Sequence, residues 1–141
     1  MRLLLGDGSD AVKEGRVATV QSLSGTGSLR VGAAFIQRYF PGKTVYLSNP
    51  TWGNHMAIFA DAGVPTEMYR YFDADTTGLD FDGMVADLKA APEGSVVLLH
   101  GCAHNPTVRQ QRARGARGSA RTAATSCSLR SAAPLLRCVL D

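Results

Sequence analysis

The sequence has few of the residues that mark small secreted or metal-binding proteins. Its 141 residues include three cysteines, Cys102, Cys127 and Cys138. An odd number without paired spacing, and without a matching group of histidines, predicts neither a disulfide framework nor a zinc site. No apolar run approaches the roughly 20 residues of a membrane-spanning helix, and the apolar run at residues 3–5 ends too early for a signal peptide. We therefore expect a reducing compartment and no membrane contact.

Lysine is missing from residues 108–141, where the charge balance also changes sign. Residues 1–107 carry eight Lys and Arg against eleven Asp and Glu, whereas residues 108–141 carry seven Arg against one acid. The formal net charge of +3 therefore averages an acidic body and a basic tail. The tail's Arg, Ala and Ser content predicts an irregular, disordered segment or the product of a shifted reading frame. An arginine-rich arm for nucleic acid is the less favoured interpretation.

Short apolar runs alternate with helical patterns in the body of the chain. Strands are expected at residues 17–20, 44–47, 66–72 and 96–100. Apolar residues at helical spacing predict helices at residues 29–40, 56–63 and 81–88. The last strand is a continuous apolar run, which is typical of a strand buried on both faces. This alternation predicts an α/β fold with a mainly parallel sheet and flanking helices.

Polar turns follow three of the predicted strands. They are Ser24-Gly25-Thr26, Asn49-Pro50-Thr51 and Asn105-Pro106-Thr107. The carboxyl ends of parallel strands lie along one edge of a sheet, so the three turns could form one site there. The first turn enters a helix through hydroxyls and glycine, which suits a phosphate group. A plain helix cap and ordinary Asn-Pro turns are the competing interpretations.

Aromatic and imidazole side chains accompany the second and third turns. Trp52 is the only tryptophan, and it could offer a flat face to a planar ring. His55 follows three residues later on the same predicted helix face, and His100 and His104 lie beside the third turn. Packing roles are the alternative for each of these side chains.

Three segments taken together carry a family resemblance. They are residues 23–30 (LSGTGSLR), 48–55 (SNPTWGNH) and 100–107 (HGCAHNPT). In order and spacing they resemble the large domain of aspartate aminotransferases, which are class I, fold type I pyridoxal-phosphate enzymes. The resemblance runs from about residue 4 to residue 107 and ends after the HNPT motif. It implies a partial cofactor-binding domain at residues 1–107 and an unrelated tail at residues 108–141.

The resemblance also implies a binding site for pyridoxal 5′-phosphate. Ser24, Gly25 and Thr26 would hold the cofactor phosphate. Trp52 would stack on the pyridine ring, and Asn105 would hydrogen-bond the phenolic oxygen of the ring. Trp52 and Asn105 would contact substrate as well. His55 and His100 would then form the supporting shell around the ring nitrogen.

The lysine that forms the Schiff base in this family has no counterpart in a matching motif here. The three lysines of the chain are Lys13, Lys43 and Lys89. We therefore expect no catalytic residue and no metal ligand. The chain would be a catalytically incomplete fragment of an enzyme that moves amino groups between aspartate or glutamate and 2-oxo acids.

The family implies amino-acid and 2-oxo-acid substrates and a homodimer, or pairing with a full-length subunit. A non-catalytic dimer partner or regulatory fragment is therefore the alternative function. The resemblance implies the cytoplasm or the mitochondrion, and the sequence shows no targeting segment. Neither a membrane nor a nucleic-acid partner is expected.

Overall fold

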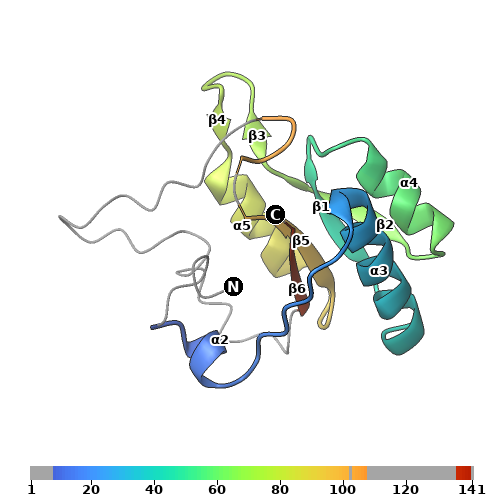
Figure 1. Ribbon diagram of the computed structural model, residues 1–141. Helices are drawn as coiled ribbons and strands as arrows, with labels where there is room; N and C mark the ends of the chain where they lie inside the picture. The colour runs from blue at the N-terminus through green and yellow to red at the C-terminus, as the bar shows by residue number, and fades with distance from the viewer. Residues whose placement is uncertain (1–7, 102, 108–135, 141) are drawn as a thin grey trace.

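The computed structural model describes residues 8–101, 103–107 and 136–140, and for residues 136–140 it describes the backbone (Figure 1). The helices are α2 (Asp10–Lys13), α3 (Ser24–Tyr39), α4 (Asn54–Asp61) and α5 (Phe81–Ala90). The strands are β1 (Val45–Asn49), β2 (Thr66–Arg70), β3 (Phe72–Asp73), β4 (Gly78–Leu79), β5 (Val96–His100) and β6 (Leu136–Leu140). No helix in the described part of the chain is long and apolar enough to cross a membrane.

A four-stranded sheet with the order β2-β1-β5-β6 forms the centre of the molecule. Each neighbouring pair is parallel, and the register places Val45 opposite both Thr66 and Val96. Strands β3 and β4 form a separate antiparallel pair. The predicted α/β fold with a mainly parallel sheet is therefore confirmed.

Two apolar cores lie on the two faces of this sheet. On one face α3 and α4 cover Val45, Leu47, Val96 and Leu98, and on the other face α5 covers Tyr46 and Val97. Successive side chains of a strand point to opposite faces, so neighbouring residues of β1 and β5 join different cores. This arrangement explains why both strands have almost continuous apolar sequences.

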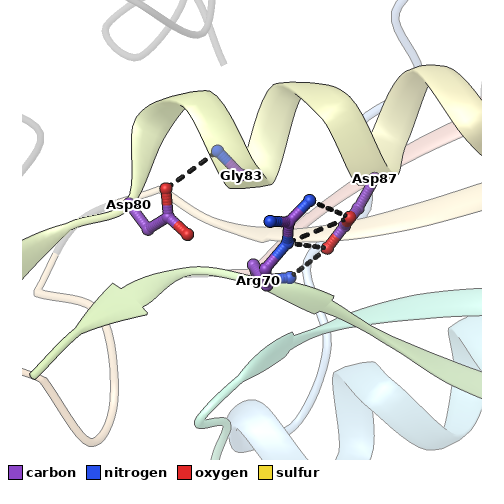
Figure 2. Close-up of polar contacts among 4 residues, drawn as sticks. All are labelled: Arg70, Asp80, Gly83 and Asp87. Carbon is purple, nitrogen blue, oxygen red and sulfur yellow. Dashed lines mark hydrogen bonds and ion pairs between the residues drawn. The ribbon is translucent and has the colours of Figure 1, made fainter.

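Polar contacts cap α5 at its start and join it to strand β2 (Figure 2). The carboxylate of Asp80 caps the helix by accepting a hydrogen bond from the Gly83 backbone N–H at 2.8 Å. The Arg70 guanidinium binds both oxygens of Asp87, at 2.7–3.1 Å, and the Arg70 backbone N–H donates to the same carboxylate. This ion pair holds the pKa of Asp87 at about 2 through hydrogen bonds from Arg70.

The chain before α3 differs from the prediction, because residues 17–20 form no strand. Val20 is 76% exposed, and α3 begins directly at Ser24. A β-branched run needs a neighbouring strand to pair its backbone groups, and sequence preference alone does not supply one. The predicted strand at residues 17–20 was therefore wrong.

The irregular structure predicted for the tail does not hold at its end. Residues 136–140 form β6, which pairs in parallel register with β5 from Val96 to His100. Strand β1 pairs with one edge of β5, so the other edge offers free backbone N–H and C=O groups that need partners. The prediction for residues 108–135 lies outside the described residues.

Candidate functional site

The turns after β1 and β5 lie at the carboxyl edge of the sheet, and α3 begins at the same end of the molecule (Figure 1). Helix α3 is 16 residues long, and a short connection joins its C-terminus to the start of β1. Such a helix runs back along the sheet, so its N-terminus reaches the carboxyl edge. The three predicted turns therefore share one end of the fold.

His55 is buried in the first turn of α4, with a contact on either side. Its Nδ1 lies 2.6 Å from the Thr51 hydroxyl, and its ring meets the half-buried Trp52 indole edge-on with 5.5 Å between ring centroids. On the other side the rings of His55 and His100 meet at 90° with centroids 5.1 Å apart. Through these contacts of His55, the second turn packs against the end of β5.

His100 has a defined tautomer because of the chain that follows it. The backbone N–H of Asn105 donates to His100 Nδ1 at 3.1 Å. An N–H can only donate, so Nδ1 is the acceptor and neutral His100 carries its proton on Nε2. That Nε2 is buried, and it has no hydrogen-bond partner within the described residues. The arrangement leaves a buried donor at the carboxyl edge of the sheet, a feature that usually implies a further acceptor.

His104 completes this group, although the sequence did not single it out as a site residue. Its ring stacks between Tyr71, at 3.9 Å, and His100, at 4.3 Å. Its Nε2 lies 2.8 Å from the Ser48 hydroxyl, and its Nδ1 lies 3.0 Å from the Thr107 hydroxyl. Its signals in the sequence were its position directly before the third turn and its spacing of four residues from His100.

The three histidines are kept neutral by their surroundings. Burial, and then the neighbouring His100, lower the pKa of His55 to about 4. Burial and the same neighbour lower the pKa of His104 to about 4, and burial lowers the pKa of His100. Because an imidazolium in this setting would lose its hydration, the cluster holds uncharged rings at neutral pH.

Ser24, Gly25 and Thr26 form the first turn of α3. No hydrogen bond or ring contact among the described residues joins this turn to the cluster. Ser24 adopts φ +57°, which serine seldom does, and the N-cap residue Leu23 supplies no side-chain hydrogen bond. The first backbone N–H groups of α3 are therefore open to an anion. The phosphate role stays a prediction.

Of the predicted site residues, the structure brings four into one connected group. Trp52, His55, His100 and Asn105 are linked by the ring contacts and the hydrogen bond given above. The side chain of Asn105 faces solvent at the border of this group. The candidate site therefore combines an aromatic and imidazole wall with an uncapped helix N-terminus at the same end of the fold (Figure 1).

A parallel α/β sheet with polar turns at its carboxyl edge defines a class of ligand-binding domain. Residues 1–109 match the family model of class I and II aminotransferases. The chain belongs to this aminotransferase family.

Several aspartate aminotransferases are similar in sequence to this chain. The chain is 69% identical over 105 residues to the mitochondrial aspartate aminotransferase P2 of Lupinus angustifolius, and 67% identical over 105 residues to the chloroplastic enzyme of Arabidopsis thaliana. Each match covers 74% of this chain and 23% of the relative. The chain thus spans about a quarter of the length of these relatives. A cytoplasmic relative from rice is 56% identical over 106 residues.

Solved structures give the same result for the fold. Aspartate aminotransferase from the cytoplasm of Saccharomyces cerevisiae matches with a TM-score of 0.64 and 51% identity, over 74% of this chain and 26% of that one. An aromatic-amino-acid aminotransferase from Burkholderia pseudomallei, covalently bound to pyridoxal phosphate, matches with a TM-score of 0.64 and 48% identity, over the same shares. The described body of the chain therefore has the fold of these aminotransferases.

Proposed function

We propose that the chain is a partial cofactor-binding domain of an aspartate-aminotransferase-like protein, able to bind pyridoxal phosphate but unable to transaminate alone. The observation that carries this proposal is the neutral cluster of Trp52, His55 and His100 at the same end of the fold as the open N-terminus of α3 (Figure 1). An aromatic face suits a planar ring, and an uncapped helix N-terminus suits a phosphate.

The residues present fit the cofactor on two grounds. The buried His100 Nε2–H lacks an acceptor within the described residues, as expected of a site that is completed by another group. The hydroxyls of Ser24 and Thr26 are exposed at the start of α3, where backbone N–H groups are also free. Ser24, Gly25 and Thr26 would hold the phosphate, Trp52 would lie on the ring, and Asn105 would bind at its edge. Once bound, pyridoxal phosphate supplies an electron sink for the substrate's α-carbon.

The positions of the lysines support the proposed lack of activity. Lys43 precedes β1, and its Nζ donates to the Glu93 carbonyl at 3.0 Å. Lys89 lies in the last turn of α5, which leads to the start of β5, and Lys13 lies in α2. Figure 1 shows these segments at the other end of the sheet from the carboxyl edge. Covalent catalysis on a carbonyl cofactor needs an amine at the site itself.

Titration of the purified chain with pyridoxal phosphate tests this function, and the single tryptophan provides the signal. We expect saturable quenching of Trp52 fluorescence, weaker quenching by pyridoxal without its phosphate, and competition by inorganic phosphate. Ser24→Ala with Thr26→Ala should remove the advantage of the phosphorylated form. Equal quenching by both forms would contradict the phosphate site.

Borohydride reduction followed by peptide mass spectrometry tests the absence of a cofactor lysine. The expected result is no preferred labelling among Lys13, Lys43 and Lys89, and no conversion of aspartate with a 2-oxo acid. Stoichiometric labelling of one lysine would overturn the proposed inactivity.

A non-catalytic partner of a full-length subunit is the second candidate. The observation in its favour is an exposed apolar face of α3, where Val31, Phe35 and Tyr39 follow one another at helical spacing. Co-purification of tagged chain with a full-length aspartate aminotransferase would support it, and a clean pull-down without that enzyme would exclude it.

A further inference from the structure

His104 has the contacts of a residue that holds others in place. It is 5% exposed, and its ring lies nearly parallel to both neighbours, at 15° to Tyr71 and 22° to His100. A flat group packed between two rings cannot tilt unless one of them moves. The ring of His104 therefore controls the plane of His100.

The position of His104 is itself fixed from both edges of the ring. Ser48 comes from β1 and Thr107 from the turn after β5, and their hydroxyls meet Nε2 and Nδ1 at 2.8 and 3.0 Å. A neutral imidazole has one donor and one acceptor, and a hydroxyl can serve as either, so both nitrogens are satisfied. His104 thus connects strand β1 to the turn that carries Asn105.

The connection reaches Asn105 through His100. The hydrogen bond from the Asn105 N–H to His100 Nδ1 requires the His100 ring to hold its plane, because the bond weakens steeply with angle. Loss of that plane would release the Asn105 backbone and allow the Nδ1–H tautomer of His100. Two features of the site, the Nε2–H donor and the placement of Asn105, depend on one stacking contact.

We propose that His104 is a positioning residue, which stacks on His100 and so fixes its tautomer and the backbone of Asn105 at the cofactor site. The consequence for cofactor binding rests on the proposed function, whereas the effect on His100 does not.

Ring ¹⁵N NMR tests the proposal, since the chain has three histidines and each spectrum is simple to assign. In the wild type we expect His100 as the Nε2–H tautomer and an Asn105 amide protected from hydrogen exchange. His104→Gln removes the ring and should give mixed His100 tautomers, a higher His100 pKa and an unprotected Asn105 amide. His104→Phe is the matched control, because it keeps a flat ring in the stack, and it should preserve the His100 tautomer.

Cofactor titration is the second measurement on the same variants. His104→Gln should weaken the affinity for pyridoxal phosphate by about tenfold, which corresponds to the loss of about one hydrogen bond. His104→Phe should bind pyridoxal phosphate with the affinity of the wild type. An unchanged His100 tautomer in folded His104→Gln overturns the proposal. The proposal is also overturned if His104→Phe loses the Nε2–H tautomer of His100, or if the Asn105 amide of the wild type exchanges freely. The measurement on the wild-type amide needs no variant, so it tests the proposal even where a variant does not fold.

The two proposals fail in different ways. If the His100 tautomer responds as expected but neither wild type nor variant binds pyridoxal phosphate, the positioning role stands and the proposed function falls. If the cofactor binds the wild type while the His100 tautomer ignores His104, the function stands and the positioning role falls.

Discussion

At the scale of single residues, the neutral histidines make the stability of the fold depend on pH. The folded pKa values of His55 and His104 are about 4, below the usual 6.5 of an exposed histidine. Between these values the unfolded chain binds more protons than the folded chain, so the free energy of unfolding rises with pH. This contribution is complete above about pH 6.5 and is lost as the pH falls toward 4.

We predict that urea unfolding, followed by circular dichroism, gives a free energy that falls by roughly 2–4 kcal/mol between pH 6.5 and pH 4.5. His55→Asn keeps a side-chain amide near Thr51 but does not titrate in this range. The variant should lose stability at neutral pH and show a shallower pH slope. An identical slope in wild type and variant would show that His55 is not held neutral by the fold.

The grouping of the candidate site residues could be predicted where a sequence motif contains them, but not where the grouping depends on a contact between distant parts of the chain. Trp52, His55, His100 and Asn105 lie in conspicuous segments, and the structure brings them together. His104 lay in the same segment, but its importance depends on Ser48, which is 56 positions earlier in the chain. Pairing across parallel strands sets that contact, and local spacing does not reveal it.

At the scale of elements, helix α5 shows how a glycine can be required beside a cap. A Cβ placed on Gly83 would collide with the carboxylate of Asp80 that caps the helix. Alanine elsewhere in a helix is more stable than glycine by up to about 1 kcal/mol, whereas a lost cap costs about 1 kcal/mol. At Gly83 the added methyl group displaces the capping carboxylate, so the gain in helix propensity comes with the loss of the cap.

We therefore predict that Gly83→Ala lowers the melting temperature, because the capping carboxylate of Asp80 must move (Figure 2). Gly25→Ala is the matched control, since a Cβ at Gly25 in the first turn of α3 meets no atom within 4 Å. It should leave the melting temperature unchanged or raise it slightly. A fall in both variants would mean that the cap of α5 has no special role.

The helices and strands that are buried in the core were the ones that the sequence predicted correctly. Strand β5 is apolar on both faces and was predicted over its full extent, and α5 was predicted from apolar spacing alone. Residues 17–20 have the same β-branched character but no strand beside them, so the sequence pattern misled. Strand β6 was missed because its place depends on the open edge of β5, which becomes visible only after the sheet is assembled.

At the scale of the whole molecule, the chain exposes surfaces that a globular domain usually covers. Strand β2 is an edge of the four-stranded sheet, and in α3 the residues Phe35 and Tyr39 are 47% and 59% exposed. The rings of Phe35 and Tyr39 pack against each other with centroids 4.8 Å apart, so they form one apolar patch. Patches of this kind on isolated domains favour association.

We predict that the purified chain associates in a concentration-dependent manner, and that Phe35→Ser with Tyr39→Ser reduces this association. The opposite face of α3, formed by Leu29, Ala33 and Ile36, makes the core contacts, so the double variant should keep its melting temperature. Ala34→Ser changes an exposed residue of the same helix outside the aromatic pair and should leave association unchanged. Sedimentation velocity over a hundredfold range of concentration separates these outcomes. If the double variant associates as strongly as the wild type, the aromatic patch is not responsible, and the open edge of β2 becomes the surface to block.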